Sequence, residues 1–265
     1  MSQEDIIKYS QQIVLYKSQQ DYLVANGFFV VYEIYPYFVT VNHAIEPERH
    51  YEGDTHLVLH ANGKELNTRT FKLTKWQFID LYSFPKNDRK ENIFSFPYLD
   101  KREDFAFCQA QKEELQSTIS ELPYRIMDAD PASCHHKHFD FIQMPTQITK
   151  PIIDGHYHIA GKILTESTGP MWEYKSYFYT NMKYIGSFEG LYQFQSSQSA
   201  TLDDWKGLSG SPVFDDDLKL VGMAVRYNDY DNILLVFPAD DIAWYLRNDC
   251  IPTPEGMEYY NNRSS

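Results

Sequence analysis

The stretch Gly207-Leu-Ser-Gly-Ser-Pro-Val-Phe214 is the most informative part of this sequence, because it has the form of a nucleophile loop. Gly207 permits a sharp turn that points its N–H inward, and Gly210 leaves room for a substrate backbone to pass. The N–H groups of Gly207 and Ser209 are predicted to form an oxyanion hole, beside a Ser209 hydroxyl that acts as the nucleophile. Ser211 lies in the same loop and is the alternative nucleophile.

A serine nucleophile needs a base and a third group that orients the base, and the sequence supplies both upstream. His43 ends the strand-like run Tyr37-Phe-Val-Thr-Val-Asn42, and Asp104 immediately precedes the apolar run Phe105-Ala-Phe107. The order along the chain is therefore histidine, aspartate, serine. Asp100 belongs to the same charged run as Asp104 and is the alternative orienting acid.

These residues in this order resemble the trypsin-like serine proteases of the chymotrypsin fold, and most closely their bacterial Htr-type branch. Four further stretches carry the resemblance. Asn26–Val30 is similar to the opening hairpin, and Asp154–Gly161 to the first strand of the second barrel. Leu218–Val225 is similar to the strand pair behind the nucleophile, and Phe237–Leu246 to the closing helix. The likeness covers roughly residues 20–248. Residues 247–265 are expected to be too few for the PDZ domains of that branch.

The resemblance implies an all-β fold of two six-stranded antiparallel Greek-key barrels with short N- and C-terminal helices. The expected division has five parts: an N-terminal helix over residues 1–18, a first barrel with His43 and Asp104 over 19–120, an inter-barrel connection over 121–147, a second barrel with Ser209 and the closing helix over 148–249, and a polar tail over 250–265.

Local patterns add detail to this division. Residues 2–5 resemble a capping box and predict a helix over residues 3–16. Asn62-Gly63 predicts a hairpin turn between strands at residues 57–60 and 66–73. Two earlier strands are expected over residues 28–33 and 37–42, around Tyr35-Pro36, and the closing helix is expected over residues 239–248.

Composition narrows the classes of partner. The net charge of −13 argues against a surface for nucleic acid or anionic membranes, which bind clustered cations. Three cysteines argue against a disulfide framework and favour a reducing compartment. The N-terminus lacks a signal-peptide pattern, and no apolar run reaches the roughly 18 residues that a membrane span needs. We therefore expect a cytoplasmic protein without nucleic-acid or membrane partners.

The other histidines and cysteines offer a weaker hypothesis. Cys134-His-His-Lys-His-Phe-Asp140 contains zinc-ligand types, which leaves a metal-dependent hydrolase as a third interpretation, although a solvated connecting loop is favoured. His156 and His158 are expected to be packed or surface side chains, and Cys108 a buried core thiol. No metal or organic cofactor is predicted.

The activity that the resemblance implies is peptide-bond hydrolysis through an acyl-enzyme intermediate. His43 would accept the Ser209 proton, Asp104 would orient the imidazole, and the N–H groups of Gly207 and Ser209 would bind the oxyanion. The expected protein is an intracellular regulated endopeptidase acting on protein or peptide substrates, by analogy a bacterial stress or defence effector. The alternative is a catalytically silent protease-like interaction module.

Single residue positions predict the substrate specificity and the way in which the activity is controlled. In the resembled fold, Asp203 would form the base of the specificity pocket and favour a basic residue before the scissile bond. Arg226 and Tyr227 would lie on the far wall, where Arg226 would favour an acidic residue if it pointed inward and Tyr227 would narrow the entrance. Basic or small residues are expected at this position. Leu208 replaces the aspartate that pairs with a newly cut N-terminus in digestive relatives. Control through loop ordering or a regulatory protein partner, without N-terminal cleavage, is therefore expected.

Overall fold

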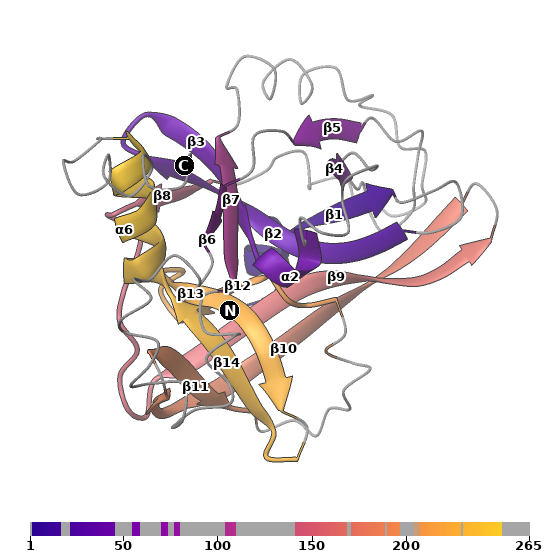
Figure 1. Ribbon diagram of the computed structural model, residues 1–265. Coiled ribbons are helices and arrows are strands. Elements are labelled where there is room, and N and C mark those ends of the chain that lie inside the picture. The colour runs from indigo at the N-terminus through magenta and orange to yellow at the C-terminus, as the bar shows by residue number, and fades with distance from the viewer. Residues whose placement is uncertain are drawn as a thin grey trace, which may run out of the picture.

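The computed structural model describes residues 2–16, 22–45, 55–58, 70–73, 77–79, 104–109, 141–168, 171–188, 190–196, 205, 207–228 and 230–250. These residues form two β units, a sheet of eight strands and a closed barrel of six, with a long helix near the C-terminus (Figure 1). The expected all-β class is confirmed. None of the helices in the described residues is long and apolar enough to cross a membrane.

The first helix is capped as the sequence predicts, but it is short. In α1 (Gln3–Ile7), the Ser2 hydroxyl accepts from the Asp5 N–H, and the Asp5 carboxylate accepts from the Ser2 N–H at 2.7 Å. The predicted helix over residues 3–16, and with it the N-terminal helical unit over residues 1–18, is therefore wrong beyond Ile7.

The residues after this helix join the first sheet instead. β1 (Gln11–Tyr16) pairs antiparallel with β2 (Tyr22–Tyr32) on one edge and with β4 (Thr55–Val58) on the other. Ile13 and Val14 fit either a helical face or a strand, and β-branched residues favour the strand once partners lie on both sides. Tertiary pairing thus decides the conformation of this run.

The first sheet has the strand order β5-β4-β1-β2-β3-β7-β6, and β8 pairs with β2. The remaining bounds are β3 Tyr35–Thr40, β5 Thr70–Leu73, β6 Gln77–Ile79, β7 Phe105–Gln109 and β8 Ile142–Met144. The β4–β5 pairing confirms the predicted hairpin strands, whose Asn62-Gly63 turn lies outside the described residues.

β8 is a correction to the expected division of the chain. It falls within the segment 121–147 that was assigned to the inter-barrel connection, and it pairs in parallel with Val30–Tyr32. β1 covers β2 only as far as Gly27, so the end of β2 keeps a free edge that β8 fills. The first unit consequently has eight strands and one parallel pair instead of six antiparallel strands.

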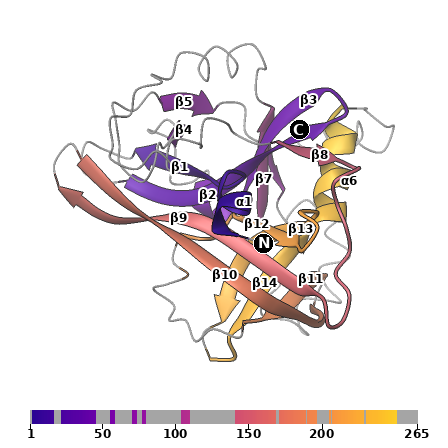
Figure 2. The same ribbon diagram turned by 180° about the vertical axis from the view of Figure 1, so that it is seen from behind.

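The second unit closes in the order β10-β11-β14-β13-β12-β9. Its bounds are β9 His156–Thr168, β10 Met171–Phe188, β11 Leu191–Gln195, β12 Pro212–Asp215, β13 Leu220–Asn228 and β14 Ile233–Pro238. The closing helix α6 (Ala239–Cys250) follows as predicted and buries Ile242 and Leu246. β9 and β10 also run past the first sheet, where β9 contacts β1 and β2 (Figures 1 and 2).

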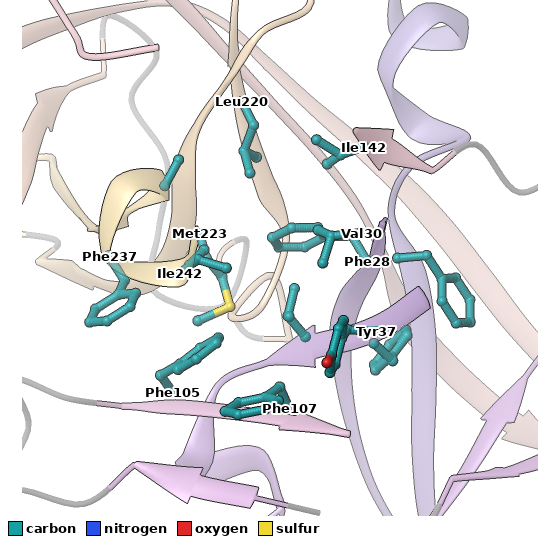
Figure 3. Close-up of a cluster of buried hydrophobic side chains, with 14 of the residues drawn as sticks. Phe28, Val30, Tyr37, Phe105, Phe107, Ile142, Leu220, Met223, Phe237 and Ile242 are labelled. Carbon is teal, nitrogen blue, oxygen red and sulfur yellow. The ribbon is translucent and has the colours of Figure 1, made fainter. Parts of the chain in front are cut away.

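One apolar core joins the two units. Phe105 of β7 stacks on Phe237 of β14 with ring centroids 5.3 Å apart, and Met223 and Ile242 pack in the same cluster (Figure 3). All four residues are buried. Since close-packed cores resist relative displacement, this cluster fixes the first sheet against the barrel.

Candidate active site

The predicted base and orienting acid meet because β3 and β7 are adjacent. Thr40 at the end of β3 lies opposite Ala106 near the start of β7, so the residues just beyond each of them face one another. His43 lies in α2 (Asn42–Ile45), the single helical turn that follows β3, and Asp104 directly precedes β7. Strand register therefore brings together two residues that are far apart in the sequence.

Asp104 holds His43 by two contacts. One carboxylate oxygen, Oδ1, accepts the His43 backbone N–H at 2.7 Å, and Oδ2 contacts His43 Nδ1. A carboxylate accepts hydrogen bonds, so this contact favours the tautomer with the proton on Nδ1 and leaves Nε2 as an acceptor. The imidazole is 47% exposed and Asp104 is 14% exposed, so the acid is shielded while the base stays accessible.

The Ser209 loop is anchored to the same end of β3. The Ser209 carbonyl accepts from the Asn26 N–H at 3.0 Å, and the Asn26 carbonyl accepts from the Thr40 hydroxyl at 2.6 Å. At Gly210, where φ is +86°, an added Cβ would overlap the Asn26 carbonyl oxygen. The loop therefore packs against the strand that delivers His43, and only glycine fits at Gly210.

The loop's backbone hydrogen bonds leave the two predicted oxyanion donors available. The N–H groups of Leu208, Gly210 and Ser211 donate to carbonyls of Trp205, Ala224 and Leu208, respectively. Within the described part of the chain, no hydrogen bond is formed by the N–H groups of Gly207 and Ser209. Both residues are partly exposed, so their N–H groups are free to bind an anion.

The two serines of the loop differ in accessibility. Ser209 is partly exposed, and its hydroxyl donates to the Val225 carbonyl at 3.2 Å. Ser211 is fully buried, and its hydroxyl has no hydrogen-bond partner among the residues that the structure describes. Because a nucleophile must reach its substrate, these positions favour Ser209 over Ser211.

Leu208 secures the loop from the apolar side. It is 1% exposed and packs in the barrel core, and a Cβ added at Gly161 of β9 would overlap its side chain. The absence of a side chain at Gly161 therefore makes room for Leu208. An apolar side chain thus anchors the loop next to Ser209.

The predicted specificity residues lie in different environments. Arg226 is exposed, whereas Tyr227 is buried and stacks on Trp205 with ring centroids 4.4 Å apart. Tyr179 also stacks on Trp205, with ring centroids 4.4 Å apart, which gives a cluster of three aromatic rings just upstream of the loop. Asp203 lies outside the described residues, as does Asp100.

The remaining candidate ligands form no metal centre in the described ranges, where no group of three or more histidine, cysteine, aspartate or glutamate side chains could hold a metal. His158 is buried and its Nε2 lies 2.7 Å from Asp216 Oδ1, as expected for a packed histidine. The Cys134–Asp140 cluster lies outside the described residues. Cys108 is buried, as predicted, and burial raises the pKa of its thiol.

Comparison with known proteins supports the fold. No family model and no curated protein sequence matches the chain. Among solved structures, human heparin binding protein superposes with a TM-score of 0.55 at 9% identity over 91% of each chain. A serine endoprotease from Yersinia pestis gives 0.54 at 10% identity over 94% of this chain and 66% of that one. A scabies mite inactivated protease paralogue gives 0.52 at 10% identity over 91% and 90%.

These similarities show the trypsin-like, chymotrypsin-type two-barrel fold. The same fold is shared by a protein described as an endoprotease, one described as an inactivated paralogue and one named for heparin binding. Activity must therefore be argued from the site, not from the fold.

Sequence reasoning missed Asn26, which touches the Ser209 loop at more than one point. It stands in an otherwise apolar stretch, Leu23-Val-Ala-Asn-Gly-Phe-Phe29, and asparagine is depleted in strands. A polar residue in such a run was the available signal, since buried polar groups need partners.

Proposed function

We propose that this chain is a serine endopeptidase resembling the Htr-type branch, which hydrolyses peptide bonds through Ser209, His43 and Asp104. The observation that carries the proposal is that Asp104 binds His43 just beyond the end of β3, while the Ser209 loop binds Asn26, whose carbonyl accepts from Thr40 at that same strand end. A base, its orienting acid, a nucleophile and two available N–H donors are the groups that acyl transfer requires.

In the proposed reaction, the Ser209 hydroxyl rotates from the Val225 carbonyl toward His43 Nε2 as substrate binds. His43 accepts the hydroxyl proton while the oxygen attacks the peptide carbonyl, and it returns the proton to the leaving amine. The N–H groups of Gly207 and Ser209 bind the developing oxyanion, and removal of one such donor costs about 10²–10³ in kcat in related chemistry. Water then attacks the acyl-enzyme with His43 as base.

We propose that the residue before the scissile bond is basic or small. The carboxylate of Asp203 would attract a basic side chain at the base of the pocket that the resemblance implies, and Tyr227, whose ring stacks on Trp205, would narrow the entrance. Arg226 is exposed on β13 and would meet only more distant parts of a substrate. Cleavage of a peptide library would test this, and a profile dominated by large aromatic residues would contradict it.

The cellular setting that we propose is the cytoplasm, with activity controlled by a regulatory partner or by ordering of the loop. The sparse cysteines and the buried Cys108 thiol suit a reducing compartment. Net charge of −13 disfavours nucleic-acid and anionic-membrane partners. A role in bacterial stress or defence rests on analogy alone.

The test is labelling of the purified chain by a fluorophosphonate probe, which reacts with activated serines. We expect wild type and Ser211→Ala to be labelled and Ser209→Ala to be unlabelled with an unchanged circular dichroism spectrum. Loss in Ser211→Ala with retention in Ser209→Ala would move the nucleophile. A folded, unlabelled wild type would favour the second candidate, a silent interaction module, which the Ser209–Val225 hydrogen bond also suits.

A further inference from the structure

Asn26 is the residue through which the first sheet holds the Ser209 loop. It is fully buried on β2, one residue beyond the point where β3 ends, since Thr40 pairs with Gly27. Its main chain is therefore not paired with β3, and its N–H donates instead to the Ser209 carbonyl at 3.0 Å. The end of one strand thus exposes a backbone donor to the loop.

The Asn26 side chain makes a second link to the same loop. Its amide nitrogen, Nδ2, donates to the Gly207 carbonyl. The backbone N–H and the side chain of one residue therefore hold the carbonyls at both ends of Gly207-Leu-Ser209. The two N–H groups available for an oxyanion, those of Gly207 and Ser209, belong to this same tripeptide.

A glycine-flanked loop needs such an external hold. Gly207 and Gly210 adopt φ values of +91° and +86°, and glycine has little intrinsic preference among backbone conformations. Rotation about the bonds that flank Gly207 would change the relative orientation of the peptide planes that carry the two donors, at small steric cost. The Asn26 amide opposes that rotation, because its bond to the Gly207 carbonyl holds the Gly207–Leu208 peptide plane that lies between them, and breaking the bond would take an acceptor from the buried Asn26 amide.

Ser10 holds the other end of the Asn26 amide. The buried Ser10 hydroxyl donates to Asn26 Oδ1 at 3.1 Å. A flip of the amide would place two acceptors together at the Gly207 carbonyl, so that carbonyl sets the direction of the amide and the Ser10 bond holds it in place. Ser10 follows α1 and precedes β1, so the N-terminal segment takes part in setting the loop.

We propose that Asn26 is a positioning residue of the site, held in place by Ser10, that keeps the Gly207–Ser209 backbone in the form that binds an oxyanion. The inference rests on the proposed peptidase function and deepens it. It makes the uncut N-terminal segment part of the assembled site and gives a physical reason for activity without N-terminal cleavage.

Two substitutions separate the side chain from the backbone contacts. Asn26→Ala keeps the main-chain hydrogen bonds and removes the amide. Asn26→Asp keeps the shape and the Ser10 contact, but presents an acceptor to the Gly207 carbonyl. Thr40→Val is the matched control, since it removes an equally buried hydrogen bond to Asn26 without touching the amide.

The measurement is the rate of fluorophosphonate labelling at saturating and subsaturating probe, on protein shown to be folded at the assay temperature. We expect Asn26→Asp to lower the saturating rate by about 100-fold, the scale of one lost oxyanion donor, with the half-saturating concentration unchanged. The saturating rate should fall less in Asn26→Ala and less again in Ser10→Ala, and in Thr40→Val it should stay within a few-fold of the wild-type rate. Saturating rates for both Asn26 variants equal to that of Thr40→Val would overturn the proposal.

A second measurement does not depend on activity. Hydrogen exchange of a peptide covering residues 205–211 should be faster in both Asn26 variants than in Thr40→Val. An unlabelled wild type would refute the peptidase function. The comparison of hydrogen-exchange rates would then still test whether Asn26 positions the loop. Equal exchange in all variants would refute that role in either case.

Discussion

Replacing Asp104 by asparagine keeps the shape of the side chain but removes one of the two acceptor oxygens that His43 uses. In the native pair, Oδ1 accepts the His43 backbone N–H at 2.7 Å and Oδ2 contacts Nδ1. An asparagine can serve only one of these donors. If its oxygen keeps the backbone N–H, its NH₂ group faces Nδ1 and favours the tautomer with the proton on Nε2, which cannot accept a proton from Ser209.

The size of the effect follows from two contributions. If the imidazole keeps the productive tautomer, its Nδ1–H faces the NH₂ group of the new asparagine. This contact between two donors costs about 1–3 kcal/mol, or one to two decades in rate. Loss of the carboxylate removes attraction to the imidazolium of at most about 4 kcal/mol for a pair near the surface, and the half-exposed imidazole reduces this further. We therefore expect Asp104→Asn to slow Ser209 labelling by about 10³–10⁴-fold.

Stability should change little, because asparagine keeps the shape of the side chain and one of its two hydrogen bonds to His43. We expect a loss of about 1 kcal/mol in the free energy of unfolding. Fluorophosphonate kinetics and thermal denaturation give the two numbers, and imidazole nitrogen NMR reports the His43 tautomer. Labelling within tenfold of wild type, or a large loss in Asp100→Asn instead, would refute Asp104 as the orienting acid.

Three further predictions concern the loop, the core thiol and the N-terminus. Gly210→Ala should abolish labelling and lower the free energy of unfolding by several kcal/mol, because the added Cβ would overlap the Asn26 carbonyl. The control Gly186→Ala, at φ +142° with no described atom within 4 Å of the added Cβ, should lose only about 1–3 kcal/mol to backbone strain and should keep labelling. Chemical denaturation compares the two variants, and equal losses of stability would contradict the close approach at Gly210. Cys108 should resist a thiol-specific reagent in native protein and react on unfolding, since burial raises its pKa; rapid native modification would contradict its position. Mass spectrometry of labelled protein should show an intact N-terminus, and labelling confined to chains trimmed near residues 17–22 would exclude a role for Ser10 in the active form.

The serine loop could be predicted from sequence because its chemistry is local. Gly207, Ser209 and Gly210 form their turn within a few residues, so spacing alone carries the information. The meeting of His43 with Asp104 depends instead on the β3–β7 register. Order along the chain and resemblance suggested that pair, but pairing between distant strands determines it.

Runs that suit two conformations were harder to assign. Residues 11–16 satisfy a helical pattern and form a strand, because β2 and β4 supply partners on both edges. The β2–β3 hairpin turns after Tyr32, and Pro36 lies within β3 rather than at the turn expected around Tyr35-Pro36. Within the described residues the β7 pairing begins at Tyr37, so Pro36 lies near the start of β3, where proline is tolerated.

The proposed site depends on how the two units are fixed to each other, since each supplies part of it. Phe105 directly follows Asp104 and stacks on Phe237, so the residue next to the acid packs in the core shared with the barrel. Asn26 provides the polar counterpart by holding the barrel's loop from the first sheet. Because apolar packing fixes distance but not the rotation of a peptide plane, the two contacts are complementary. On the proposed assignment, we expect assembly of the oxyanion hole to need both the shared core and the Asn26 amide.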